Sequence, residues 1–435
     1  MGEVEKVPKI ASAGERLADG AIVEPVQAEP GSERLRLLLW NGTKSEIGVE
    51  VKHGGRTYIP AAIDPSLLRA MTLPSQRSKP EAVRQLVTDI SKVLSGYTNV
   101  GENFAAALSR FVLSTWVVQS LPVAPWLAVV GPESNASTQL RRLLRSLCRH
   151  ALTLTGISVN GLCSLPSGWN FTLLISQPEL RPNLARLLYA ARNRDGNILR
   201  RGRLHRLYAP VATFTRTCPD FNGSTVSLEI PAIPMGAPLS LLDDNSEKRI
   251  ADEFQARLLG YLIDNTSKVE TSKEKGAGLN YRIQELAQAL AVTTPDDNDL
   301  QNEIVEILKA QDAAMRPVRL GGIEGVVIEA ILFHCHEGRQ DRIYISEIAE
   351  TAQEILTRRG EDLVLTARRV GDKLRHLRFL TEPRDRRGFS LVLNQGNCSH
   401  AHELGRVFDV PTLQDGVDRC KHCGPGTNPQ KSGSY

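Results

Sequence analysis

The chain has 435 residues, 41% of them hydrophobic, and its 53 basic and 49 acidic residues give a net charge of +4. This length and composition predict a soluble, globular protein of about two to four domains. The nearly balanced charge excludes a nucleic-acid binder that depends on overall charge, so a nucleic-acid surface must come from local clusters.

The cysteines and the longest apolar stretch bear on the compartment. The seven cysteines are an odd, scattered set and no apolar signal segment opens the chain, so the sequence predicts a cytoplasmic protein without a disulfide framework. The stretch from Phe104 to Val130 is interrupted by charged and polar residues and by two prolines. It therefore predicts a buried helix followed by a buried strand, and no membrane partner.

Changes of pattern along the chain predict the order of the domains. The first residues are rich in Glu, Ala, Gly and Pro without an apolar period, which is typical of disorder. Later segments show β-rich runs, alternating buried strands and helices, and then helical patterns. We expect a disordered N-terminus (1–33), a small β-hairpin element with a helical lead-in (34–100), a P-loop NTPase-like domain of three α/β layers with a mostly parallel sheet (101–235), a helical lid (236–320), an α+β winged helix (321–395) and a C-terminal tail (396–435).

The sequence GPESNAST, residues 131–138, follows the apolar run WLAVV and precedes a helical pattern. A phosphate-binding loop, GxxxxGK[S/T], lies between a buried strand and a helix, where its backbone N–H groups and its lysine bind the phosphates. Gly131 and Thr138 match the first glycine and the final hydroxyl, but Ala136 replaces the second glycine and Ser137 replaces the lysine. Phosphoryl transfer depends on such charges, so we expect the loop to persist without the reaction.

A second element of such ATPases is also altered. A working site requires a buried strand that ends in an acidic pair, which holds Mg²⁺ and polarises the attacking water. The candidate strand FTLLI, residues 171–175, is followed by Ser176 and Gln177, which are neutral. The stretch PDFNGSTVSLEIP, residues 219–231, lacks the arginine that such enzymes supply to a neighbouring subunit. We therefore expect no catalytic residues at this site.

The order of these motifs resembles a known family. The segments WLAVVGPESNASTQLRRLLRSL, TLLISQPEL, LLYAARNRDGNILRRG and VSLEI are similar to those of AAA+-like P-loop ATPases of the phage and plasmid primase-helicase type. The resemblance covers residues 100–393 and implies a helical lid and a C-terminal winged helix. It also implies a degenerate nucleotide site formed by Gly131, Ala136, Ser137, Thr138, Ser176 and Gln177.

Two other interpretations of the loop stay open at this point. Gly, Pro, Ser and Asn are common turn residues, so GPESNAST also fits an ordinary turn between a strand and a helix. A helix N-terminus attracts anions even without a lysine, so weak ATP binding without hydrolysis is the other alternative.

Two basic segments are candidates for contact with nucleic acid. Residues 186–206 hold seven arginines and one acid, which predicts either a contact with the nucleic-acid backbone or a solvated basic loop. In the helix of residues 366–379, capped by Thr366, Val370 and Leu374 belong to an apolar stripe that leaves basic side chains outward.

This helix and the following wing predict DNA binding by the winged helix, and a surface for protein contacts is the alternative. From residue 366 to residue 387, eight Lys or Arg oppose three acids. The expected DNA-binding residues are Arg368, Arg369, Lys373, Arg375, Arg378, Arg384, Arg386 and Arg387.

The C-terminal tail contains a CxxC pair, with a cysteine and histidines upstream of it. Cys398, His402, Cys420 and Cys423 together predict a tetrahedral structural Zn²⁺ site, and a reduced, exposed tail is the alternative.

These features predict a cytoplasmic, DNA-associated protein with a catalytically degenerate AAA+-like domain that acts as a scaffold or regulator in replication or mobile-element processes. DNA, replication or mobile-element proteins and further copies of the chain are the expected partners. An active ATP-dependent helicase or primase-helicase motor with divergent motifs and a protein-interaction adaptor are the alternatives.

Overall fold

The computed structural model describes residues 9–29, 31–79, 81–166, 168–200, 203–217, 227–232, 240–270, 281–337, 342–361, 363–386, 388–408 and 410. The chain divides into two compact units, and the main division along the sequence falls between Lys309 and Ala310. The part before this point is called unit 1 and the part after it unit 2. No helix in these ranges is both long and apolar enough to span a membrane.

Unit 1 begins with two small sheets. The first contains β1 (Lys9–Ser12), β7 (Arg56–Pro60) and β6 (Val51–His53), in that order. The second is antiparallel and contains β2 (Glu15–Arg16), β3 (Ile22–Gln27), β4 (Leu35–Trp40) and β5 (Ser45–Gly48). A shared core that includes Val23, Leu37 and Tyr58 holds the two sheets together.

The expectation of a disordered N-terminus is wrong for the described residues from 9 to 29. Every residue of β3 is buried, and Val23 packs against Leu37 of β4. The buried carboxylate of Glu24 accepts hydrogen bonds of 2.7 and 2.6 Å from Arg149. The segment therefore buries apolar surface and a compensated charge against later parts of the chain, which its composition does not reveal.

Helices connect these sheets to the centre of unit 1. They are α1 (Pro65–Ala70), α2 (Val83–Thr98) and α3 (Glu102–Trp116), followed by a 3-10 turn (Val118–Ser120). From Leu108 to its end α3 is buried on all sides, which agrees with its predominantly apolar sequence. The apolar stretch after Phe104 is thus a buried helix followed by a strand, as predicted.

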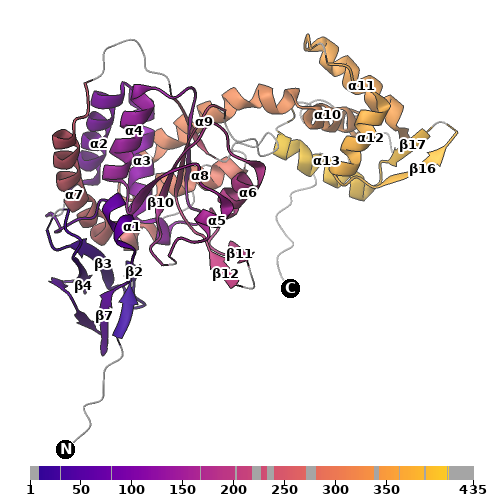
Figure 1. Ribbon diagram of the computed structural model, residues 1–435. Coiled ribbons are helices and arrows are strands. Elements are labelled where there is room, and N and C mark those ends of the chain that lie inside the picture. Colours follow the sequence, from indigo (N-terminus) through magenta and orange to yellow (C-terminus); the bar gives the residue numbers. More distant parts are fainter. Residues whose placement is uncertain are drawn as a thin grey trace, which may run out of the picture. The chain divides into compact units, whose positions relative to one another are not determined.

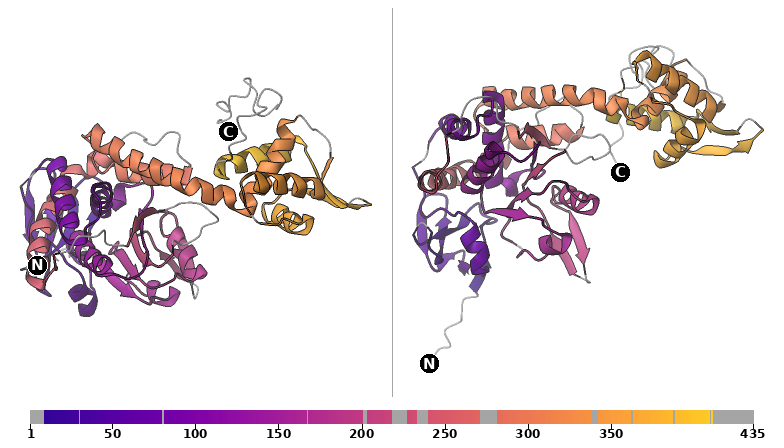
Figure 2. Two further views of the ribbon diagram at one scale, coloured as in Figure 1. Left: turned by 90° about the horizontal axis from the view of Figure 1, so that it is seen from above. Right: turned by 45° about the horizontal axis from the view of Figure 1, so that its top comes forward.

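The centre of unit 1 is a parallel sheet of five strands in the order β14-β8-β13-β10-β9. These are β8 (Trp126–Val130), β9 (Ala151–Thr155), β10 (Thr172–Ser176), β13 (Val211–Thr215) and β14 (Leu228–Pro231), and they alternate with α4 (Asn135–Leu147), α5 (Val159–Leu162) and α6 (Pro182–Ala190). Figures 1 and 2 show α4 with α2 and α3 on one side of the sheet and α5 with α6 on the other. This mixed α/β arrangement, with a loop that leads from β8 into α4, is consistent with a P-loop NTPase-like fold.

Two further features complete unit 1. β11 (Asn197–Arg200) and β12 (Arg203–Arg206) form an antiparallel hairpin that projects away from the sheet (Figure 1). The helical region contains α7 (Asp244–Glu270), α8 (Tyr281–Ala291) and α9 (Asn298–Gly321), and the last part of α9, from Ala310, belongs to unit 2. Glu247 of α7 accepts hydrogen bonds from Arg142 and Arg145 of α4, so α7 is fixed to the sheet domain.

Unit 2 contains a second set of helices and a small sheet. Its elements are α10 (Ile323–His336), β15 (Arg342–Tyr344), α11 (Ile345–Arg358), α12 (Ala367–His376), β16 (Thr381–Asp385), β17 (Gly388–Val392) and α13 (Gln395–Phe408). The strands pair antiparallel in the order β15-β17-β16. Figures 1 and 2 show the β16–β17 hairpin projecting from the helices. Thr366 caps α12 by accepting a hydrogen bond from the Arg369 N–H, as predicted.

Candidate functional site

The loop between β8 and α4 retains the first glycine of the predicted nucleotide site. Gly131 has a φ of +141°, which L side chains rarely adopt, and an added Cβ would lie 3.2 Å from the Cβ of Ala232. The Gly131 N–H donates to the carbonyl of Thr215 over 2.9 Å, and the Ala232 N–H donates to that of Val130 over 2.8 Å. Glycine is therefore required here, because the loop is held tightly between the ends of β13 and β14.

The first turn of α4 is closed by its own serines. Ser134 Oγ accepts a hydrogen bond of 3.1 Å from the Ser137 N–H, and Ser137 Oγ accepts one of 2.9 Å from the Ser134 N–H. The Ser134 hydroxyl also donates to the carbonyl of Ala232 over 2.7 Å. Such a reciprocal capping box satisfies N–H groups that would otherwise be available to donate hydrogen bonds to a bound phosphate. The serine at the lysine position, only 6% exposed, thus contacts its own loop.

The neighbouring sequence positions fit the same picture. Ala136, at the second glycine position, is 5% exposed inside the first turn of α4. Thr138, at the position of the Mg²⁺-binding hydroxyl, is half-buried, and its N–H donates to the carbonyl of Ser134 over 3.0 Å. The N–H groups of Ser134, Ser137 and Thr138 are thus all engaged in hydrogen bonds within the loop and the first turn of α4.

Ser176 and Gln177 lie at the carboxyl end of β10, where an active enzyme carries its acidic pair. Arg141 of α4 donates a hydrogen bond to Ser176 Oγ, and its guanidinium lies 3.8 Å from the carboxylate of Glu133. The Gln177 N–H donates to the carbonyl of Phe214 over 3.2 Å. A cation thus lies beside the position from which a carboxylate would hold Mg²⁺, and like charges oppose metal binding there.

Arg141 is a residue that the sequence interpretation did not single out. It lies three positions after Thr138 on α4, and residues at this spacing share one face of a helix. This spacing could have indicated that Arg141 lies near the predicted site, because the face of α4 that carries Thr138 must also turn toward the end of β10. The sequence could not show that the guanidinium would contact Ser176.

Helix α12 of unit 2 carries the predicted basic face. Val370 and Leu374 are fully buried, so the apolar stripe faces the core of unit 2 as predicted. Basic side chains on the opposite face are exposed, namely Arg368, Arg369, Arg375, His376 and, just after the helix, Arg378. Arg375 pairs with Asp372, and Arg369 Nη1 donates to the carbonyl of Val364 over 3.2 Å.

The prediction that Lys373 faces freely outward is wrong. Its ammonium group forms an ion pair with Glu324 of α10, and the two side chains are 32% and 28% exposed. Burial alone would raise the pKa of Glu324, but the hydrogen bond from Lys373 lowers it below its ordinary value. Spacing along α12 carries no information about α10, so the sequence could not reveal this partner.

The hairpin of unit 2 is described only in part. Arg386 is exposed, the backbone of Arg384 lies in β16, and Arg387 lies outside the described residues. Leu380 and Phe389, which the sequence interpretation passed over, expose 77% and 51% of their surface at this hairpin. The hairpin therefore presents both apolar and basic side chains to solvent.

The predicted zinc site falls partly within the described residues. Cys398 and His402 lie one turn apart on α13, whereas Cys420 and Cys423 lie outside the described residues. The Cys335 thiol donates to the sulfur of Cys398 over 3.6 Å and lowers its pKa, and His402 Nε2 lies 3.3 Å from His336 Nε2. The described part of the chain contains no group of three or more side chains arranged to hold a metal ion. The zinc site therefore stays a prediction.

Comparison with known proteins finds structural likeness only. No family model and no curated protein matches the chain. It is similar to a full-length MCM homolog from Methanopyrus kandleri (11% identity, TM-score 0.36, covering 68% of this chain and 80% of that chain). It is also similar to the NrS-1 C-terminal region (12%, 0.35, 86% and 96%) and to the SCCmec type IV Cch active helicase (11%, 0.39, 92% and 81%). Likeness at this level defines no family for the chain.

Proposed function

We propose that this protein is a DNA-associated scaffold or regulator whose P-loop NTPase-like domain no longer hydrolyses ATP. The observation that carries the proposal is the capping box of Ser134 and Ser137. It engages N–H groups with which an active loop would bind phosphate, and it places a serine where such a loop has its lysine. The contact of Arg141 with Ser176 supports it, because a cation lies beside the position from which a carboxylate would hold the metal ion.

ATP titration and phosphate release test the loss of hydrolysis. We expect the purified protein with ATP and Mg²⁺ to release phosphate at the rate of a blank, because no ammonium group supports the transition state in the loop. Thr138→Val is the control variant, since it removes the one hydroxyl that matches the metal-binding position. Turnover by the wild-type chain that Thr138→Val abolishes would contradict the proposal, whereas turnover that survives it would indicate a contaminant.

DNA association is assigned to unit 2. The element order α10-β15-α11-α12-β16-β17, with the sheet order β15-β17-β16, supports a winged helix in which α12 is the recognition helix. Arg368 and Arg378 are exposed on or beside α12, so their guanidinium groups are accessible to DNA phosphates. We further propose replication or mobile-element proteins and copies of the chain as partners.

A double charge reversal tests this surface. Arg368→Glu with Arg378→Glu should weaken duplex DNA binding, because two phosphate contacts are lost. The slope of log K against the logarithm of the salt concentration should become less steep by about 2. Arg406→Glu is the matched control, because Arg406 is exposed on α13 of the same unit. DNA binding that both variants leave equally strong, measured by fluorescence anisotropy at several salt concentrations, would refute the assignment.

A protein-interaction adaptor is the second candidate function. It is favoured by Leu380 and Phe389, which expose apolar surface at the β16–β17 hairpin. Leu380→Ser with Phe389→Ser should then abolish binding of a protein partner while DNA affinity stays unchanged. Loss of DNA affinity alone in this variant would exclude the adaptor.

A further inference from the structure

Unit 1 contains a pocket at the edge of the parallel sheet opposite the β8–α4 loop. It lies at the amino ends of β10 and β13, where Phe171 and Ala209 line it, whereas the loop follows the carboxyl end of β8. Its volume is about 680 Å³, and small-molecule sites span roughly 300–1,000 Å³. The pocket is therefore large enough for a ligand and separate from the degenerate nucleotide loop.

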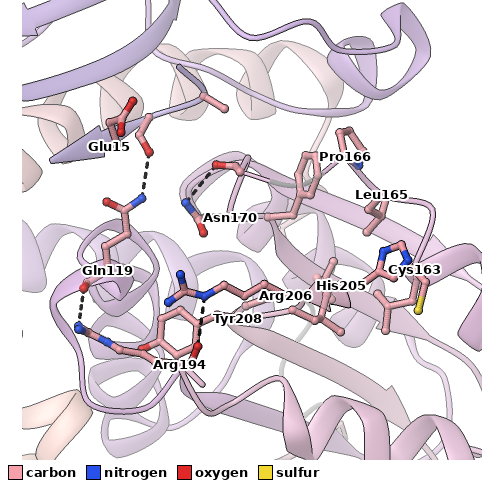
Figure 3. Close-up of a pocket in the computed structure, with 18 of the residues that line it drawn as sticks. Glu15, Gln119, Cys163, Leu165, Pro166, Asn170, Arg194, His205, Arg206 and Tyr208 are labelled. Carbon is pink, nitrogen blue, oxygen red and sulfur yellow. Dashed lines mark hydrogen bonds between the residues drawn. The ribbon is translucent and has the colours of Figure 1, made fainter. Parts of the chain in front are cut away.

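The two sides of the pocket differ in chemistry. Figure 3 shows Leu165 and Pro166 on one side, near Cys163 and His205, and Glu15, Gln119 and Arg194 on the other. Leu162, Phe171 and Leu173 add to the apolar lining. An apolar wall that faces polar groups selects a ligand with a compact apolar body and a polar end.

The polar side carries positive charge. Arg194 and Arg206 both line the pocket, and Glu15 is the sole carboxylate among its lining residues. Arg194 is fixed, because it donates to the backbone carbonyls of Gln119 and Leu121. These arginines have no ion-pair partner among the described residues, so the charge of the pocket favours an anionic ligand.

Arg206 is placed to contact that ligand. Its Nε donates to the carbonyl of Arg194 over 3.2 Å, which fixes the base of the guanidinium, and its side chain is exposed. In Figure 3 this guanidinium extends between Asn170 and Tyr208, within the pocket. A guanidinium held in this way can donate two parallel hydrogen bonds to a phosphate.

We propose that this pocket binds a nucleotide unit, with the base against the apolar wall formed by Leu165 and Pro166 and the phosphate against Arg206. A free mononucleotide and one unit of a single strand share this chemistry. A base pair does not, because the base must leave its partner to reach the apolar wall. The site does not depend on α12 or on the β8–α4 loop.

Protection of Cys163 from alkylation tests the proposal. Cys163 lines the pocket and is partly exposed, whereas Cys148, Cys335 and Cys398 are buried. The rate of its modification by N-ethylmaleimide is measured by mass spectrometry of the Cys163 peptide in the full chain, with dTMP, with oligo(dT) or with a duplex of mixed sequence. We expect dTMP or oligo(dT) to slow the modification about fivefold or more at saturation.

Each ligand gives a distinct outcome. Protection by dTMP assigns the pocket to free nucleotides, and protection by oligo(dT) alone assigns it to a strand. Protection by neither, or by the duplex alone, would overturn the proposal. Arg368→Glu with Arg378→Glu should leave the protection intact even where it abolishes duplex binding, so failure of this site and failure of the α12 surface are distinguishable.

Two variants complete the test. Arg206→Ala should weaken the binding of the protecting ligand about tenfold or more, because the loss of even one hydrogen bond to a charged group has an effect of this size. Arg186→Ala is the matched control, because Arg186 is exposed on α6 and does not line the pocket. Equal weakening by both variants would show a general effect of charge and refute the site, provided that both melt at the wild-type temperature.

Discussion

Replacing Glu24 with alanine tests the buried charge cluster that joins β3 to the end of α4. The side chains of Glu24 and Arg149 are 1% and 2% exposed, and hydrogen bonds of 2.7 and 2.6 Å join them. His150 Nε2 lies 3.3 Å from the same carboxylate. Removing one partner of such a pair leaves a buried charge uncompensated, which costs about 3–5 kcal/mol. We expect Glu24→Ala to lower the free energy of unfolding of unit 1 by this amount.

Tryptophan fluorescence measures this change, because all 4 tryptophans of the chain lie in unit 1. At about 2–4 °C for each kcal/mol, the midpoint of thermal unfolding should fall by roughly 6–20 °C. The control is Glu24→Leu with Arg149→Met, which removes both charges and is expected to unfold close to the wild-type temperature. A double variant that unfolds as early as Glu24→Ala would show that lost packing, and not an uncompensated charge, causes the effect.

The same cluster predicts a dependence on pH. Burial alone would raise the pKa of Glu24, but Arg149 and His150 together lower it below its ordinary value of 4.5. A carboxyl group with a lowered folded-state pKa contributes stability that is present above the unfolded-state pKa and is lost as the pH falls through the folded-state pKa. The urea midpoint of the wild-type chain should therefore decline below about pH 4.5, and more steeply than that of the double variant. Parallel declines would contradict this reasoning.

Three local contacts give further predictions. Thr366→Ala should destabilise α12 by about 1 kcal/mol through loss of the N-cap, seen as faster hydrogen exchange in that helix, whereas Thr366→Ser should not. Thr213→Val should cost about 1–3 kcal/mol in urea unfolding, because the buried Trp126 N–H then loses its acceptor at 3.0 Å; a neutral effect would show that another group replaces it. Gly131→Ala should cost a similar amount, since it combines a strained φ with a 3.2 Å contact to Ala232, and an unchanged melting temperature would contradict that reason.

Much of the fold could be predicted because its signals are local. The apolar runs WLAVV and FTLLI correspond to β8 and β10, since a strand buried on both faces must be apolar throughout. The stripe of Val370 and Leu374 defined the buried face of α12, and Thr366 marked its start. In each case the determining residues lie within one element or directly beside it.

The wrong predictions share a physical cause, which is a charge partner far along the chain. The glutamates of the first residues contributed to the prediction of disorder, but Glu24 pairs with Arg149, which lies 125 positions later. Lys373 looked free on α12, but Glu324 lies 49 positions earlier. From sequence alone, a charged side chain is predicted to be exposed to solvent unless an ion-pair partner can be recognised. A partner that lies far along the chain cannot be recognised in this way.

The proposed loss of ATP hydrolysis has a structural counterpart in the loop between β8 and α4. An active loop keeps its N–H groups available for phosphate, so its conformation is stabilised in part by the ligand. Here the hydroxyls of Ser134 and Ser137 each accept a hydrogen bond from one of those N–H groups, and an N-cap such as Ser134 contributes about 0.5–2 kcal/mol. The Ser134 hydroxyl also donates a hydrogen bond to the carbonyl of Ala232 after β14, which connects the loop to the strand that neighbours β8 in the sheet. A serine at the position of the lysine lacks the charge on which phosphoryl transfer depends, and its hydrogen bonds with Ser134 stabilise the start of α4.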